Sequence, residues 1–130
     1  MAMSIIGIST LSILLIGELI DYPADKEAGK WGVAVRFGTK STSILYLMVQ
    51  LILMLNIIAL SIILKPGGFI ILFSLIPYLI FLPKISRIVI ASHDQPAELP
   101  KAALMNVQLH LSFPILYSIS VIIHFPNIKL

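Results

Sequence analysis

The sequence predicts an all-helical, polytopic membrane protein with about four transmembrane helices. Of its 130 residues, 58% are hydrophobic and only 12% are charged, whereas a soluble domain carries roughly 25% charged residues. The mean hydropathy is +1.03. The apolar runs are continuous rather than alternating, which favours helices over the strands of a membrane barrel.

Four apolar segments are the candidate spans of a single transmembrane domain that covers residues 1–130. They are residues 3–20, 43–64, 69–82 and 102–125. The first has about 18 residues, which rise about 27 Å as a helix and just cross the hydrocarbon layer. The other three are of similar or greater apolar character, so each is predicted to span.

Proline and glycine mark the breaks between and within these spans. Lys65-Pro66-Gly67-Gly68 has the chemistry of a tight turn, so the third span is expected to run antiparallel to the second. Pro77 predicts a kink inside the third span, and Pro83 predicts its end. Pro96 and Pro100 are typical of first-turn positions in short helices.

The distribution of Lys and Arg predicts the orientation. Seven of them lie in the connections 21–42 and 84–101, and only Lys65 and Lys129 lie on the other side. The positive-inside rule then places both long connections in the cytoplasm and both termini outside. The net charge of +3 belongs to these connections and forms no basic stripe, so no nucleic-acid partner is expected. The chain has no cysteine, so the sequence says nothing about disulfides, thiolate catalysis or cysteine-based metal sites.

The segment from Asp21 to Arg36 holds the candidate chemistry. Asp21 and Asp25 are four residues apart, so both carboxylates share one face if the first helix continues. Mg²⁺ is commonly held by one or two carboxylates together with substrate phosphates. Lys26, Lys30 and Arg36 are cationic donors for such phosphates. The alternative is that these are ordinary solvated charges next to the membrane.

The run Asp21-x-x-x-Asp25-Lys26-x-Ala28-Gly29-Lys30, followed by Val33-Ala34-Val35-Arg36-Phe37-Gly38, resembles the second aspartate-rich motif of the UbiA-type intramembrane prenyltransferases. The resemblance is closest to the 1,4-dihydroxy-2-naphthoate and related quinone-forming branch. It implies a nine-helix fold around a lateral cavity, of which this chain would supply the C-terminal four helices.

The same resemblance implies roles for the charged residues. Asp21 and Asp25 would be catalytic magnesium ligands, and Lys26, Lys30 and Arg36 would bind the diphosphate. The partners would be a prenyl diphosphate, an aromatic acceptor and the lipid bilayer of the cell membrane, with the motif on a cytoplasmic connection.

The chain departs from the family pattern in several places. Gly17 stands where the family often has Asn, Trp31-Gly32 replaces a common Thr-Leu pair, and Pro23 interrupts the helix between the two aspartates. The first aspartate-rich motif has no counterpart. The domain is therefore expected to be incomplete, and the chain alone is expected to be inactive unless a separate chain supplies the N-terminal helices and the first motif.

Two pairs of polar residues lie within the spans. Tyr46 and Gln50 are one turn apart and could line a cavity, although interhelical hydrogen bonding is the commoner role of Gln in a membrane helix. Asn106 and His110 have the same spacing, and His110 could shuttle a proton or serve packing alone.

These observations favour the C-terminal part of a magnesium-dependent prenyltransferase that acts in quinone biosynthesis. A non-catalytic membrane subunit and an inactive truncated prenyltransferase fragment are the alternatives. A small transporter with Asp21 and Asp25 as its ion site is a third, but transport sites usually lie near the bilayer midplane.

Overall fold

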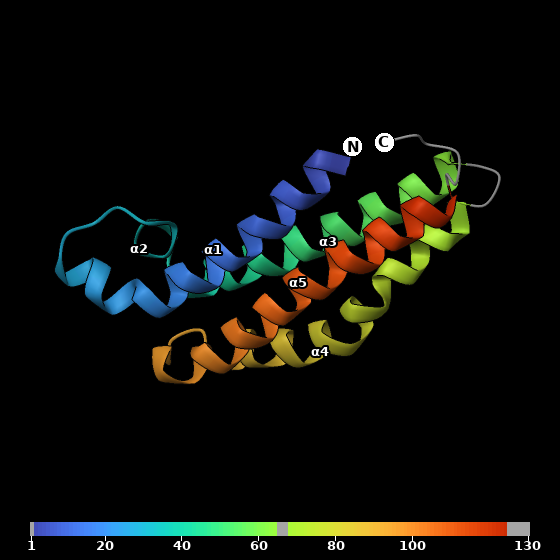
Figure 1. The fold of residues 1–130 in the computed structure, drawn as a ribbon. Helices are drawn as coiled ribbons and strands as arrows, with labels where there is room; N and C mark the ends of the chain where they lie inside the picture. The colour runs from blue at the N-terminus through green and yellow to red at the C-terminus, as the bar shows by residue number, and fades with distance from the viewer. Residues whose placement is uncertain (1, 65–67, 125–130) are drawn as a thin grey trace.

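A computed structural model describes residues 2–64 and 68–124 (Figure 1). Every regular element in these residues is a helix. Side chains are described for residues 7–64 and 68–123. The elements are α1 (Ala2–Glu27), α2 (Val33–Phe37), α3 (Thr39–Ile63), the 3₁₀ helix η1 (Gly68–Leu75), α4 (Ile76–Ala91), the 3₁₀ turn η2 (Pro96–Glu98) and α5 (Leu99–His124).

Four helical segments are long and apolar enough to cross a membrane, which confirms the predicted fold class. They are Gly7–Glu27, Thr39–Ile63, Gly68–Ala91 and Pro96–Ile123. α1 packs mainly on α3, and α4 packs mainly on α5, with α5 also in contact with α1 (Figure 1). The chain is thus an antiparallel helical bundle.

The helices extend beyond the predicted spans. α1 continues through Pro23 to Glu27, and α4 continues through Pro83 to Ala91, past the predicted span ends at residues 20 and 82. A proline removes one intrahelical hydrogen bond, but its fixed φ of about −65° is itself helical, so one proline need not end a helix.

The predicted break near Pro77 corresponds to a change of helix type. The chain is a 3₁₀ helix up to Leu75 and becomes an α-helix at Ile76, with Pro77 in the first turn, where no intrahelical N–H bond is needed. The turn residues Lys65 to Gly67 lie outside the described part. Gly68 packs so closely on the backbone carbonyl of Ser61 that a Cβ there would collide with it.

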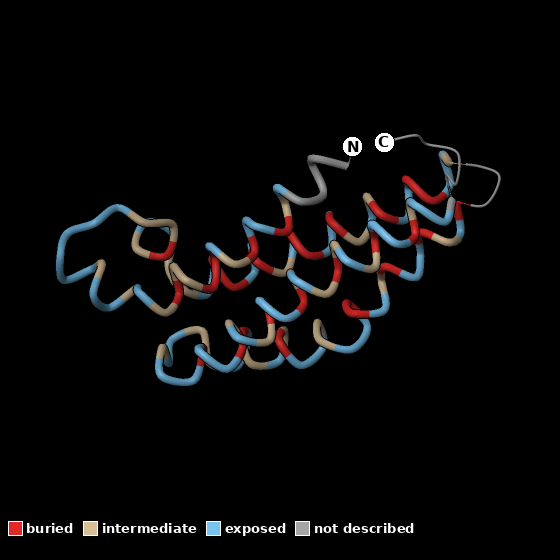
Figure 2. The backbone as a smooth tube through the Cα atoms, viewed as in Figure 1, coloured by how far each residue is buried: buried red, intermediate tan, exposed pale blue. Residues whose placement is uncertain are grey.

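The core lies where α1, α3, α5 and the η1–α4 segment face one another, and the outer faces are exposed (Figure 2). On α3 the buried positions recur at helical spacing, with Tyr46, Val49, Leu53, Ile57 and Leu60 all turned inward. The large side chains on the outer faces are also apolar, including Leu51, Leu55 and Ile62 on the same helix. Such surfaces suit lipid as the surrounding solvent.

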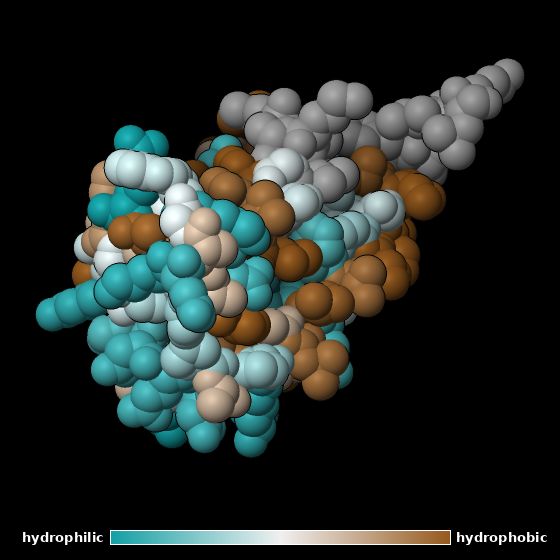
Figure 3. All heavy atoms as spheres, turned by 90° about the vertical axis from the view of Figure 1, so that its left-hand side faces the viewer, coloured by the Kyte–Doolittle hydropathy of each residue, from teal (hydrophilic) through white to brown (hydrophobic). Residues whose placement is uncertain are grey.

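One end of the bundle is polar. The connection between α1 and α3, which contains α2, and the connection between α4 and α5, which contains η2, lie at this end (Figures 1 and 3). Thr39 Oγ1 and His93 Nδ1 are 3.2 Å apart and join the two connections. The carboxylates and cations singled out in the sequence therefore lie at one end of the membrane-crossing helices.

Candidate functional site

Asp21 and Asp25 lie one turn apart near the C-terminal end of α1. The helix is continuous between them, so the condition for a shared face is met in spite of Pro23. Asp21 is exposed, whereas only 15% of the Asp25 side chain is exposed. Lys30 Nζ lies 2.8 Å from Asp25 Oδ1 in an ion pair.

The end of α1 explains how Lys30 comes to face Asp25. Gly29 has a φ of 69°, the left-handed conformation that ends many helices. The Lys30 N–H donates to the Asp25 carbonyl at 2.9 Å, and the Gly29 N–H donates to the Lys26 carbonyl at 3.3 Å. These two bonds form a Schellman motif, which folds the chain back on the last turn. The Ala28-Gly29 step of the sequence motif thus positions the Lys30 ammonium.

The surrounding carboxylates stabilise the charge of Lys30. Its pKa is raised above the usual value, first by the hydrogen bond and charge of Asp25 and then by the charges of Asp21 and Glu18. Lys30 therefore remains an ammonium at neutral pH. Its side chain is 70% exposed, so it remains accessible to an anionic ligand.

Lys26 is turned toward a different neighbour. Its Nζ lies 3.4 Å from the Tyr22 hydroxyl and 5.6 Å from the centre of the Tyr22 ring. In the described part of the chain it forms no ion pair with either aspartate. Lys26 is therefore the least well placed of the three predicted diphosphate ligands.

Glu18 fixes the short helix α2 and was not predicted from the sequence as a site residue. Its Oε2 accepts a long 3.4 Å hydrogen bond from the Ala34 N–H in the first turn of α2. Gly32 precedes α2, and a Cβ at that position would collide with the Glu18 carboxylate. Two features of the sequence could have indicated this contact. An acidic residue, Glu18, lies one turn before Asp21, and position 32 is a glycine, which has no side chain.

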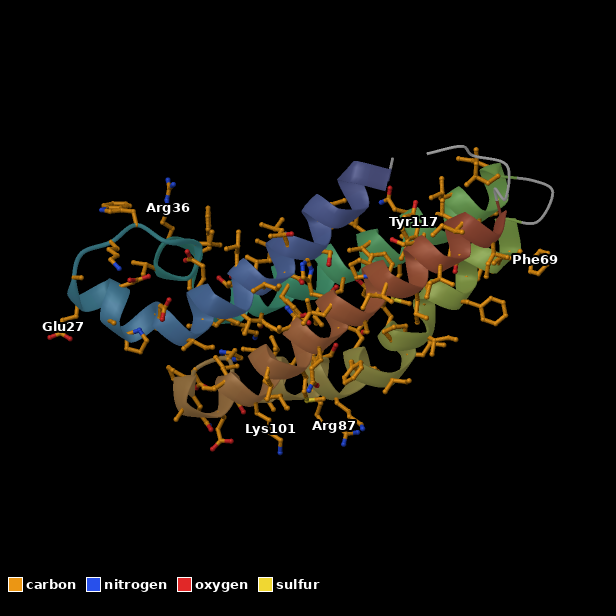
Figure 4. The ribbon with its side chains drawn as sticks, viewed as in Figure 1. Glu27, Arg36, Phe69, Arg87, Lys101 and Tyr117 are labelled. Carbon is orange, nitrogen blue, oxygen red and sulfur yellow. The ribbon has the colours of Figure 1, made fainter. Side chains whose placement is uncertain are left out.

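Lys30 and Arg36 line a common hollow of about 490 Å³ with Trp31 and Phe37. The Arg36 guanidinium lies 6.0 Å from the Trp31 ring centre and 5.8 Å from that of Phe37. Figure 4 shows Arg36 pointing away from the bundle. The structure thus brings Lys30 to Asp25 and to the hollow of Arg36, but among the described residues Arg36 contacts neither aspartate.

A second, mostly apolar hollow of about 450 Å³ shares one lining residue, Phe37, with the first. The remaining lining residues are Val33, Ser41, Thr42, Ile44, Leu45 and Met48, most of them on α3. A cationic hollow and an apolar hollow therefore share one aromatic residue in their linings.

The described residues contain no group of three or more His, Cys, Asp or Glu side chains that could hold a metal ion. Asp21 and Asp25 provide two carboxylates one turn apart, which fits the one or two protein ligands that Mg²⁺ commonly takes when phosphates and water complete its shell. The pair therefore fits a metal that arrives with a phosphorylated ligand. It does not form a complete protein cage.

A buried polar network connects three helices deeper in the bundle. The Tyr46 hydroxyl donates to Asn106 Oδ1 at 3.0 Å, and Gln50 Nε2 lies 3.1 Å from the same oxygen and 2.8 Å from the Tyr46 hydroxyl. Asn106 Nδ2 donates to Ser12 Oγ at 3.3 Å. This arrangement confirms interhelical hydrogen bonding for Gln50.

His110 is held separately, with its Nδ1 2.6 Å from Ser9 Oγ on α1. The contact gives His110 a packing partner within the bundle. The serines of α1 were not singled out in the sequence, although Ser9 and Ser12 are small polar residues one turn apart in an apolar helix.

Comparison of the chain with protein-family models, with curated proteins and with solved structures gave no match.

Proposed function

We propose that this chain forms the diphosphate-binding part of a magnesium-dependent intramembrane prenyltransferase, which transfers a prenyl group to an aromatic quinone precursor. The observation that carries the proposal is the pairing of the two hollows. The cationic one contains Lys30 and Arg36, the apolar one extends along α3, and Phe37 lines both. A prenyl diphosphate has the same division into an anionic head and an apolar chain.

The diphosphate head suits the cationic hollow. Arg36 offers a planar fork of N–H donors, and the Lys30 ammonium is exposed and permanently charged at neutral pH. The Asp25 carboxylate, which is paired with Lys30, holds that ammonium at the end of α1. Asp21 and Asp25 would hold Mg²⁺, which supplies Lewis-acid stabilisation of phosphate oxygens when it is bound.

The prenyl chain suits the apolar hollow. Ile44, Leu45 and Met48 face outward on α3 and are exposed to the bilayer side. An isoprenoid chain bound there would stay in apolar surroundings along its length, as it does in the bilayer, and van der Waals packing against these side chains would hold it. The two hollows together favour a prenyl diphosphate over a soluble phosphate.

In the proposed reaction the allylic C–O bond breaks and its electron pair leaves with the diphosphate. The allylic carbon then forms a C–C bond to the acceptor ring, and the substituted ring carbon loses its proton to the released diphosphate. Negative charge grows on the leaving diphosphate, so Lys30 and Arg36 would stabilise the transition state more than the ground state.

Trp31 is the only tryptophan of the chain and lines the cationic hollow, so it reports binding directly. The protein would be placed in phosphatidylcholine nanodiscs with Mg²⁺ and titrated with farnesyl thiodiphosphate, which ionises too slowly to react. We expect a saturable change in Trp31 fluorescence. Arg36→Gln should weaken binding about tenfold or more, because it removes a charge-assisted contact, and Asp25→Asn should weaken the dependence on Mg²⁺.

Lys40→Gln is the matched control, because Lys40 is exposed at the same end and lines neither hollow. It makes the same change of net charge as Arg36→Gln and should leave affinity unchanged. Inorganic diphosphate and farnesol should each bind much more weakly than the complete amphiphile. A fluorescence change that does not saturate, or equal losses in Arg36→Gln and Lys40→Gln, would contradict the proposal and favour a non-catalytic membrane subunit.

A further inference from the structure

We propose that a hollow between α4 and α5 binds the headgroup of an anionic phospholipid. Three cationic side chains line it: Lys84 and Arg87 from α4 and Lys101 from α5. Its volume is about 650 Å³, and Pro83, Ile88 and Met105 supply the apolar part of its lining. Figure 4 shows Arg87 and Lys101 side by side on the outer face, both pointing away from the bundle.

The three cations have no acidic partner within the described part of the chain. The ion pair that the structure shows among the described residues joins Lys30 to Asp25 at the end of α1, away from this hollow. Asp94 and Glu98, the acids of the connection between α4 and α5, are exposed and lie within 4 Å of none of the three cations. Three like charges around one hollow repel one another, and an anion among them relieves that repulsion.

The position of the hollow along the helices matches the level of lipid phosphates. Residues 69–82 of η1 and α4 are apolar, and Lys84 is the first charged residue that follows. On α5, Lys101 is the last charged residue before the apolar run that begins at Ala102. The cations of both helices therefore lie where the hydrocarbon layer ends, and basic pockets between helices at this level are suited to anionic headgroups.

The apolar lining favours a lipid over a free phosphate. Ile88 and Met105 are partly buried beside the cations, so they can contact the glycerol backbone and the first methylenes of an acyl chain. The hollow contains no carboxylate, in contrast to the Asp21 and Asp25 end of α1, so it offers no ligand for a metal diphosphate. A phosphodiester lipid such as phosphatidylglycerol fits this chemistry.

Native mass spectrometry of the protein released from nanodiscs with equal amounts of phosphatidylglycerol and phosphatidylcholine tests the proposal. We expect retained phosphatidylglycerol in the wild type. Arg87→Gln/Lys101→Gln removes two of the three cations that line the hollow and would contact the headgroup phosphate, so it should weaken retention at least about tenfold. The control Lys26→Gln/Lys40→Gln removes two charges at the same end and should retain the lipid as the wild type does.

Soluble glycerol 3-phosphate separates the two sources of phosphate. At millimolar concentration it should not displace the lipid. Displacement would show a phosphate site rather than a lipid site and would overturn the proposal, as would equal losses in the two double variants or equal retention of phosphatidylcholine. Circular dichroism of each variant identifies one that fails to fold, and in that case the single variants Arg87→Gln and Lys40→Gln give the same comparison.

Discussion

Tyr46, Gln50 and Asn106 meet in the interior although each lies on an otherwise apolar stretch of helix. Their spacing in the sequence predicted that Tyr46 and Gln50 share a face of one helix. It did not predict that Asn106 would meet them, because that contact depends on the packing of α3 against α5. Glu18 was missed for the same reason, since its partner is a backbone N–H 16 residues away.

The interior network gives the first prediction. Asn106→Ala leaves the Tyr46 hydroxyl and Gln50 Nε2 without their common acceptor, so it should destabilise the bundle by about 1 kcal/mol, the scale of interhelical hydrogen bonds in membranes. Gln108→Ala, at an exposed position on the same helix, is the control and should change little. Reversible unfolding in mixed micelles measures both, and equal effects would show that the network contributes nothing specific.

Helix ends were predictable where local chemistry decides them and unpredictable where it does not. Ala28-Gly29 carries the signal of a helix C-terminus, and α1 does end there in a Schellman motif. Pro83 marks the end of the apolar run, but α4 continues through it to Ala91, because one proline is compatible with helical φ. Pro77 predicted a kink in the third span. The structure shows a change from a 3₁₀ helix to an α-helix next to Pro77, and the sequence did not indicate this change of helix type.

The attachment of α2 gives the second prediction. The long hydrogen bond from Ala34 N–H to Glu18 is the polar contact that joins this five-residue helix to α1. Such a short helix has little stability of its own. Glu18→Ala should therefore increase amide hydrogen exchange across Ala34 to Gly38, whereas Glu27→Ala, at an exposed position of α1, should not. Unchanged exchange in Glu18→Ala would mean that apolar packing alone holds α2.

For the whole molecule, apolar composition was sufficient to predict four crossing helices, because no soluble fold can cover that much apolar surface. The sequence also placed the two long connections on one side. The structure brings them together at one end through Thr39 and His93. The hollows could not be predicted, because their shape depends on how α2 and the helix pairs pack.

Orientation in the membrane is the third prediction. The seven-to-two distribution of Lys and Arg places the α2 end in the cytoplasm. The chain has no native cysteine, so single cysteines at Glu27 and Gln95 can be probed without background. Both should react with an impermeant maleimide only from the cytoplasmic side, and a cysteine at Lys65, between the second and third spans, should react only from outside. Labelling of positions 27 and 95 from opposite sides would exclude this topology.

Dependence on further ligands is the fourth prediction. The described residues supply one carboxylate pair rather than a complete metal cage, so the purified chain should not form prenylated product from Mg²⁺, farnesyl diphosphate and 1,4-dihydroxy-2-naphthoate. A partner chain that brings the missing first aspartate-rich motif should restore turnover. In that assembly Asp25→Asn should lower turnover by orders of magnitude, and product formed by the lone chain would refute this prediction.

The most direct test of the account is to locate a bound prenyl diphosphate by photocrosslinking. A prenyl diphosphate with a diazirine on its terminal isoprene unit would be added with Mg²⁺, irradiated, and its adducts mapped by peptide mass spectrometry. We expect adducts concentrated at residues 33–48, the segment that lines the apolar hollow, and their loss in Arg36→Gln. Adducts spread over all exposed apolar faces of the bundle, and unchanged in Arg36→Gln, would contradict the central claim.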